Sequence, residues 1–408
     1  MRELDIEFVR SQFPAFKTPE LKKKSFFENA GGSYMAGAVI DRLNRFYISR
    51  KVQPYAGYEA SYLAGEEMDE SRSRLAALLG VKTDTLHFGP STSQNTYVLA
   101  QAFRKMKNNR RTLIVTNQDH EANSGVWRRL ENEGFELREW CIDKSTGSLN
   151  LRDLETLLDE RVLLVAFPHC SNILGEINDA AAICEKINSY GAYSCVDGVS
   201  FVPHGFPNIT DIGADIYLFS SYKTYGPHLG IMYISRNLNF LLENQGHFFN
   251  SSFSGKRLTP AGPDHAQIAS SAGMVDYCES LYYHHFKERS ELSRIAEKLS
   301  EMQRLHETKL LEPLLDFLKK KPNVSLLGPK TVERRVPTVS LELGSRAPDV
   351  ARKLDDLGIM TDSGDFYAVR LLDELGVDLK YGVLRFSFVH YTSAQEIEHL
   401  IKSLDNIL

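Results

Sequence analysis

One lysine lies between two short apolar segments, and its position suits carbonyl chemistry. Residues 216–219 are apolar enough for a buried strand, and Lys223 follows them in a polar turn. Gly226 and Pro227 break the chain before a second apolar segment, residues 230–234. Ligands bind at strand ends of α/β sheets, where a desolvated lysine becomes a nucleophile for a carbonyl cofactor. The alternative is an ordinary turn lysine on the surface.

Polar side chains also follow other apolar segments, and the carboxyl ends of parallel strands would bring them to one edge. His120 can stack on a flat ligand or move protons, or it is a hydrogen-bonding surface residue. Asn172 can donate to a phenolic oxygen or cap a turn. Asp197 ends a buried segment, which is costly unless it meets a cation or strong donors. A protonated pyridine nitrogen is one such partner, and a structural hydrogen-bond role is the alternative.

A serine-rich helix start suits a phosphate group. Ser91 and Gln94 have the spacing of a capping box around Thr92 and Ser93. Free N–H groups and hydroxyls at a helix start bind phosphate, although capping alone would also explain these residues. Together with the lysine, the aspartate and the histidine, this site matches pyridoxal 5'-phosphate (PLP), which is held by a Schiff-base lysine and an aspartate on its ring nitrogen.

The elements that must position these residues form a regular pattern from residue 84 onward. Short apolar segments alternate with helical ones, which is typical of a mostly parallel, doubly wound sheet. The predicted strands, about seven, are residues 85–89, 112–116, 135–141, 162–167, 192–197, 216–219 and 230–234. The predicted helices between them are residues 92–106, 124–133, 151–158 and 180–190. The two strands joined by the lysine turn predict one antiparallel member.

The pattern changes near residue 265, which predicts a second, smaller α+β domain. Its predicted helices are residues 264–286, 290–319 and 348–356, with a last helix that opens at the capping box of Ser393 and Glu396. Its predicted strands are residues 324–327, 337–343 and 382–389. We expect residues 20–265 to form a large PLP-binding domain. Residues 1–19 and 266–408 should form the small domain.

Composition is that of an ordinary globular protein. The 408 residues are 42% hydrophobic and 25% charged, with a net charge of −5. Basic residues are scattered, which gives no support to nucleic-acid binding. The acidic N-terminus does not resemble a signal peptide, and no apolar run is long enough for a transmembrane helix. We therefore expect a cytoplasmic protein that binds no membrane.

The five cysteines show neither a CxxC pair nor a metal-ligand spacing. Cys141, Cys170 and Cys195 lie in or beside apolar segments. We expect buried free thiols and no metal site.

The chain resembles fold-type I PLP enzymes of the class V aminotransferase family. That family contains cysteine desulfurases, selenocysteine lyases and isopenicillin N epimerase-like proteins, and the cysteine desulfurase-like branch is the most similar. The motifs that carry the resemblance lie at residues 27–32, 92–94, 119–123, 171–175, 196–198, 219–228 and 384–387. The sequence Tyr-Gly-Pro-His-Leu-Gly at residues 225–230 and the loop at 364–368 point to this branch.

The resemblance implies a role for each matched residue. Lys223 would bind PLP covalently and carry the proton, while His120 stacks on the ring and Asp197 binds the ring nitrogen. Arg385 would clamp the substrate carboxylate, for which guanidinium geometry is suited, unless it forms a surface ion pair. The remaining residues expected to bind cofactor are Thr92, Ser93, Asn172, Ser200, Ser220 and Tyr222, and those expected to bind substrate with Arg385 are Asn29 and Gly31.

Four departures from the family pattern bear on the reaction. The loop at residues 361–367 lacks the cysteine that desulfurases use as a persulfide nucleophile, and no cysteine follows Cys278. Ser200 replaces a usual glutamine, and Tyr222 a common histidine. Gly262-Pro263 replaces a Gly-Thr that reaches the phosphate of a neighbouring subunit, a contact that is lost or remade by His265.

These departures lead to a ranked set of functions. We expect a homodimeric PLP enzyme that cleaves a C–S bond of an α-amino acid by β-elimination without a persulfide cysteine. The alternative is an aminotransferase or an epimerase, with Tyr222 or His265 as the second acid of the epimerase. A non-catalytic PLP-fold protein is a further alternative, since fold does not fix function.

Overall fold

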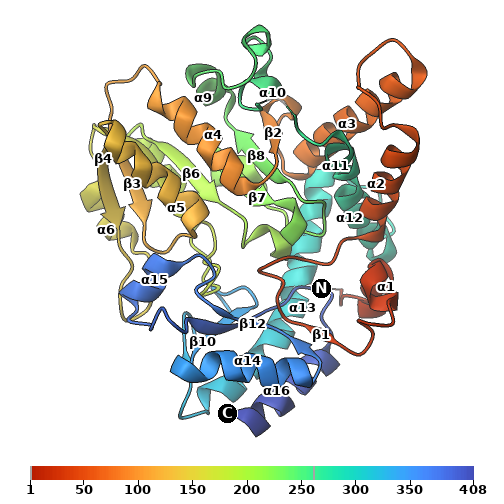
Figure 1. The fold of residues 1–408 in the computed structure, drawn as a ribbon, viewed down its shortest axis with the longest axis vertical. Coiled ribbons are helices and arrows are strands. Elements are labelled where there is room, and N and C mark those ends of the chain that lie inside the picture. The colour runs from red at the N-terminus through yellow and green to blue at the C-terminus, as the bar shows by residue number, and fades with distance from the viewer. Residues whose placement is uncertain (1, 261) are drawn as a thin grey trace.

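The computed structural model describes residues 2–260 and 262–408, which build one large sheet and a smaller one (Figure 1). The large sheet has seven strands in the order β2-β8-β7-β6-β5-β3-β4. Their bounds are β2 (Leu86–Gly89), β3 (Thr112–Thr116), β4 (Glu136–Trp140), β5 (Val162–Pro168), β6 (Tyr193–Asp197), β7 (Ile216–Ser220) and β8 (Gly230–Ile234). β8 is antiparallel to both neighbours and all other pairs are parallel. The predicted α/β sheet with one antiparallel member is confirmed.

Side chains alternate between the two faces of this sheet, as the two-residue period of a strand requires. In β7, Ile216 and Leu218 pack on the side of α4 and α5, and Tyr217 and Phe219 belong to the opposite core. Figure 1 shows α4 and α5 lying across one face of the sheet. The helices that cover the two faces include α4 (Thr92–Arg104), α5 (Glu121–Arg128), α6 (Leu151–Leu157), α7 (Ala180–Ser189), α8 (Ile209–Ile212) and α9 (Arg236–Leu241).

A second group of helices packs beside the sheet. Helices α11 and α12 contact α2 and α3, and their apolar residues share a core with the sheet. Their bounds are α2 (Gly37–Ser49), α3 (Glu59–Leu78), α10 (Ser254–Arg257), α11 (His265–Ser270), α12 (Ala272–His285) and α13 (Leu292–Lys319). The division of the chain at residues 265 and 266 remains a prediction, and these contacts favour a boundary further along the chain.

The smaller unit is a four-stranded antiparallel sheet, in the order β12-β13-β10-β9, covered by α14 and α16. Its strands are β9 (Ser325–Leu326), β10 (Thr338–Glu342), β12 (Asp362–Gly364) and β13 (Val383–Ser387). Its helices are α14 (Ala347–Asp356), α15 (Val369–Glu374) and α16 (Ala394–Ile407). The end of α13 fills its core, and the predicted capping box of Ser393 and Glu396 opens α16. Figure 1 shows α13 running from the large sheet into this unit.

The N-terminal segment also packs against the smaller unit. β1 (Ser25–Phe26) pairs in parallel with β11 (Ile359–Met360), and Phe27 joins the smaller core. α1 (Ile6–Ser11) precedes it. Residues that follow β1 are therefore held near β13.

Several sequence expectations differ from the structure in detail. Ser271 divides the predicted helix 264–286 into α11 and α12. All five cysteines are free, but Cys141 is exposed, so the expectation that it is buried is wrong. No helix in residues 2–260 and 262–408 has the length and apolar character needed to cross a membrane.

Candidate active site

Lys223 lies at the carboxyl edge of the large sheet, at the end of the short 3-10 helix η5 (Ser221–Lys223) that follows β7. Lys223 is half-buried and lines a cavity at this edge. The pKa of Lys223 is lowered to about 8, first by burial and then by the positive charge of Arg385, against the opposing charges of Asp197 and Glu28. A substantial fraction of neutral, nucleophilic amine is therefore present near pH 8.

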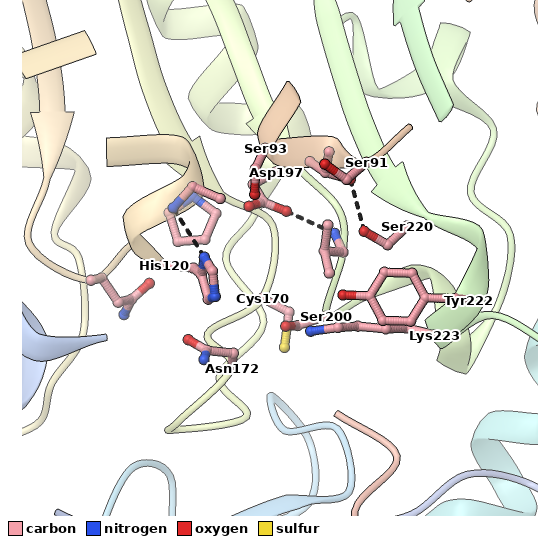
Figure 2. A pocket seen from close by; sticks show the side chains of 15 residues that line it. Ser91, Ser93, His120, Cys170, Asn172, Asp197, Ser200, Ser220, Tyr222 and Lys223 are labelled. Carbon is pink, nitrogen blue, oxygen red and sulfur yellow. Dashed lines mark hydrogen bonds between the residues drawn. The ribbon is translucent and has the colours of Figure 1, made fainter. Parts of the chain in front are cut away.

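Asp197 ends β6 and lines the same cavity (Figure 2). Its Oδ1 accepts a hydrogen bond from the Val199 N–H at 2.8 Å, which fixes the carboxylate. Burial raises the pKa of Asp197 to about 6, against the Val199 N–H and the charge of Lys223. The group is thus ionised at neutral pH and can face a cationic ring nitrogen.

His120 is the N-cap of α5, a role that the sequence did not indicate. Its Nδ1 accepts a hydrogen bond from the Ala122 N–H at 3.0 Å, so the proton of the neutral ring lies on Nε2. The pKa of His120 is lowered to about 3, mainly by burial and to a smaller extent by the charges of Lys223 and Arg385. A neutral, flat imidazole whose orientation is fixed can stack on an aromatic ligand.

The predicted phosphate site forms where α4 begins beside the end of β7. The hydroxyls of Thr92 and Ser220 lie 2.8 Å apart, and Ser91 caps the helix by accepting from the Gln94 N–H at 3.1 Å. A Cβ on Gly230 would lie 2.3 Å from the carbonyl carbon of Ser91. Only glycine therefore allows β8 to begin this close to the N–H groups of the helix start.

The structure brings the predicted cofactor residues together in one cavity at the carboxyl edge of the sheet. The lining includes Thr92, Ser93, His120, Asn172, Asp197, Ser200, Ser220, Tyr222 and Lys223 (Figure 2). It also includes Gln118 and Cys170, which the sequence did not single out for this site. Asn172 keeps a buried Oδ1 without a hydrogen-bond partner in the described part of the chain. This unpaired atom, the hydroxyl cluster and the buried aspartate form a set of groups that fits PLP.

An adjoining cavity contains Arg385, from β13, together with His120, Asn172, Tyr222 and Lys223. Arg385 is buried, so the alternative of a surface ion pair is wrong. It does form an ion pair, however, because its Nη2 lies 2.6 Å from Oε1 of Glu28. The guanidinium also lies over the Phe366 ring, 3.7 Å from its centroid.

Of the other two residues expected at the substrate, only Gly31 lines this cavity. Asn29 is buried and lines a separate small cavity with Ser200 and Lys223. Its Oδ1 accepts from the Tyr391 hydroxyl at 2.5 Å. The structure therefore places Asn29 near the lysine and away from the guanidinium of Arg385.

The structure shows where the positions that depart from the family pattern lie relative to the two cavities. The loop after β12 passes over the cavity mouth, with Phe366 and Tyr367 at φ of 49° and 59°. Cys170 is the one cysteine of the described chain that lines the cofactor cavity, but burial raises the pKa of its thiol and its Sγ donates to the Gly175 carbonyl at 3.4 Å. It is held as a thiol and is a poor nucleophile. His265, at the start of α11, lines neither cavity.

The low pKa of Lys223 predicts how PLP capture depends on pH. Only the neutral amine attacks a carbonyl group, so the rate at which cofactor-free protein binds PLP covalently should rise with pH and level off above about 8. An ordinary lysine would level off more than two pH units higher. Stopped-flow absorbance between pH 6 and 10 measures the midpoint, and a midpoint near 10 would contradict the buried, desolvated amine.

Comparison with known proteins gives matches over the whole chain. Residues 25–400 match the profile of a family described as aminotransferase class-V. An aminotransferase-like protein, FGM3, of Gibberella zeae is 32% identical over 420 residues, covering 99% of this chain and 98% of that protein. The cysteine desulfurase-like protein ustD of Aspergillus flavus is 28% identical over 421 residues, covering 99% of this chain and 91% of that protein.

A solved structure gives the same result for the fold. The apo structure of cysteine desulfurase from Thermococcus onnurineus NA1 superposes with a TM-score of 0.83 at 23% identity, covering 100% of this chain and 98% of that one. The seven-stranded sheet and the small antiparallel sheet are thus those of cysteine desulfurase structures.

Proposed function

Because the chain belongs to the aminotransferase class-V family, we propose that it is a PLP-dependent enzyme that acts on an α-amino acid. One observation carries the proposal. Lys223, Asp197 and His120 come from three separate parts of the chain and line one cavity at the carboxyl edge of the sheet. Each has the protonation state that PLP chemistry needs at neutral to mildly alkaline pH.

Each of these residues would have a separate role in the reaction. The neutral amine of Lys223 would hold the cofactor covalently and would act as the base that takes the proton from the substrate Cα. The ionised carboxylate of Asp197 would keep the ring nitrogen of the cofactor protonated, and the His120 ring would hold the cofactor ring by stacking. When bound, PLP supplies an electron sink for the negative charge that develops at Cα. Arg385 orients the substrate through its carboxylate.

The phosphate group of the cofactor would bind at the start of α4. The hydroxyls of Thr92 and Ser220 lie side by side there, next to the free N–H groups of the first helical turn. Ser93 and Tyr222 line the same part of the cavity. These contacts fix the end of the cofactor that takes no part in the reaction.

For the reaction itself we propose elimination of a β-substituent with cleavage of a C–S bond. The similarity to a cysteine desulfurase-like protein supports it. The site offers no thiolate to accept sulfur, because the loop over the cavity has no cysteine and Cys170 is held as a thiol. The sulfur product therefore leaves as a free small molecule. Transamination is the second candidate, supported by the similarity to an aminotransferase-like protein.

Product analysis tests these reactions against each other. Purified holoenzyme would be incubated with the common amino acids, S-substituted cysteines and cysteine sulfoxides. Pyruvate together with a free thiol, sulfide or sulfenate supports elimination. Pyridoxamine phosphate together with a keto acid would replace elimination with transamination. Inversion at Cα without either product would replace it with epimerisation.

Removing the exposed thiol should leave turnover intact. Cys141 is the exposed cysteine of the described chain and lies outside both cavities. If no persulfide forms on the protein, Cys141→Ser should retain turnover within about twofold, as expected for a surface substitution. Cys278→Ser should behave alike, since burial in α12 raises the pKa of that thiol to about 12. A complete loss in either variant, with an unchanged melting temperature, would contradict a cysteine-free mechanism.

We also infer that the protein is a homodimer. Large aromatic side chains are exposed around α2, α3 and the 248–253 segment, which is unusual for the surface of a monomer. They are Tyr47, Tyr55, Tyr58, Tyr62, Phe248, Phe249 and Phe253, and Phe248 is 85% exposed. Light scattering in dilute solution measures the mass, and a monomer would contradict the inference.

A further inference from the structure

The guanidinium of Arg385 is already paired with a carboxylate group of its own chain. Glu28 follows β1, and its backbone bridges to Ser387 of the small sheet. Phe27, the residue before it, is fully buried in the core of the smaller unit. This anchoring directs the Glu28 side chain toward Arg385, and the two charged groups meet at 2.6 Å. The contact is therefore a feature of the fold and does not depend on a freely moving surface side chain.

Each partner of the ion pair keeps a polar atom that could form a further hydrogen bond. Oε2 of Glu28 and Nε of Arg385 are buried without a hydrogen-bond partner in residues 2–260 and 262–408. A two-point carboxylate–guanidinium contact would satisfy both atoms, but the observed contact joins Nη2 and Oε1 alone. Nη1 donates to the Asn172 carbonyl at 3.2 Å, and Phe366 covers one face of the guanidinium. The guanidinium of Arg385 is thus held in one orientation, but Glu28 contacts it through one oxygen instead of two.

A glycine makes this position of Glu28 possible. A Cβ on Gly31 would lie 2.5 Å from Oε1 of Glu28, too close for any real contact. The group that approaches the Gly31 backbone most closely is therefore the Glu28 carboxylate. Gly31 has no left-handed φ, so alanine fits the backbone there and would clash with the carboxylate alone.

The wall of the substrate cavity is acidic beyond this pair. Asp362 and Glu121 line the cavity together with Glu28. Glu121 lies 3.6 Å from Arg370, while Asp362 has no ion pair among the described residues. A ligand carboxylate that takes Arg385 would leave the charge of Glu28 uncompensated beside Asp362. A second ligand carboxylate would then meet repulsion from both acids.

We propose that Glu28 is a specificity-determining residue, which holds Arg385 until a substrate carboxylate replaces it by exchange. After exchange its charge stays on the cavity wall. It selects amino acids with one carboxylate and a neutral or hydrogen-bond-donating side chain, and it rejects dicarboxylic amino acids. This inference rests on the proposed binding of a substrate carboxylate by Arg385.

The test measures carboxylate binding apart from cofactor chemistry. Propanoate and succinate lack an amino group, so they probe the guanidinium of the holoenzyme without reacting at the cofactor. Titration calorimetry gives their affinities in the wild type and in Glu28→Gln. Because the variant no longer competes for Arg385, it should bind propanoate about tenfold more tightly. The preference of the wild type for propanoate over succinate should shrink by a similar factor.

A second variant keeps the charge and moves it. Gly31→Ala should also tighten propanoate binding, because the new Cβ displaces the Glu28 carboxylate from Arg385. It also covers the case in which Glu28→Gln fails to fold. Glu312→Gln, an exposed glutamate on α13, is the matched control and should change neither affinity. Unchanged or weaker propanoate binding in Glu28→Gln, or in Gly31→Ala where only that variant folds, would overturn the proposal.

Arg385→Gln separates this inference from the proposed function. If that variant binds propanoate as the wild type does, Arg385 is not a carboxylate site, and both its proposed role and the exchange fail. If Arg385→Gln weakens propanoate binding but Glu28→Gln does not tighten it, the exchange alone fails. The visible absorbance of bound PLP in each variant reports the cofactor assignment independently.

Discussion

Lys223→Ala should remove the visible absorbance of lysine-bound PLP and lower turnover by about 10³-fold or more. The variant keeps the other groups of the cavity, so PLP can still bind through its phosphate and ring. It loses the amine that holds the cofactor covalently and the base that takes the proton from Cα. Proton transfer by a positioned side chain is worth about 10²–10⁴ in rate, and covalent capture of the cofactor is lost in addition.

The structure predicts that this loss is chemical and not a result of unfolding. The side chain of Lys223 lines both cavities and forms no ion pair among the described residues, so its removal breaks no direct charge contact. The melting temperature of the cofactor-free variant should therefore be close to that of the cofactor-free wild type. Lys402→Ala, an exposed lysine on α16, is the control for loss of a lysine elsewhere. An unchanged spectrum in Lys223→Ala would refute the assignment of the cofactor.

Much of the large sheet could be predicted because its signals are local. The strand predicted at residues 112–116 has the bounds of β3, since its apolar run is uninterrupted and polar residues flank it. The turn after β7 could be predicted from Gly226 and Pro227, which break the chain between two apolar segments. The convergence of Asp197 with Lys223 followed from topology alone, because parallel neighbours end at the same edge.

The ion pair at the substrate cavity could not be predicted in the same way. Glu28 and Arg385 are separated by 357 positions and meet only because β1 pairs with β11 and the Glu28 backbone bridges to Ser387 of the smaller sheet. Cys170 lines the cofactor cavity because it lies in a turn that contacts distant residues. Its local sequence is the same as that expected of a cysteine in the hydrophobic core. Contacts of this kind depend on the complete fold, so local patterns carry no signal for them.

Asp119 shows an intermediate case. The motif at residues 119–123 indicated His120, while the aspartate before it has a buried role of its own. Asp119 accepts from the Thr116 hydroxyl at 2.7 Å and from the Asn123 amide at 3.0 Å. Burial raises its pKa to about 7, and the nearby charge of Asp197 contributes. The motif thus holds α5 to the end of β3 and thereby positions the histidine.

Asp197→Asn should lower turnover by about 10²–10³, or about 3–4 kcal/mol of activation free energy. Asparagine has nearly the same shape, and its oxygen can still accept from the Val199 N–H, so the fold should persist. The variant loses the negative charge that, in the proposed mechanism, keeps the ring nitrogen protonated, and with it most of the electron-withdrawing power at the substrate Cα. Covalent attachment of PLP should remain, because Lys223 is unchanged.

A second measurement on Asp197→Asn separates loss of charge from general damage to the site. The charge of Asp197 raises the pKa of Lys223 against the effect of burial. Without that charge the lysine should be neutral at still lower pH, so the midpoint of covalent PLP capture should move below about 8. A distorted site that admits water would move the midpoint up, toward that of an ordinary lysine. Reduced turnover with a lowered midpoint supports the electrostatic role of Asp197, whereas wild-type turnover would contradict it.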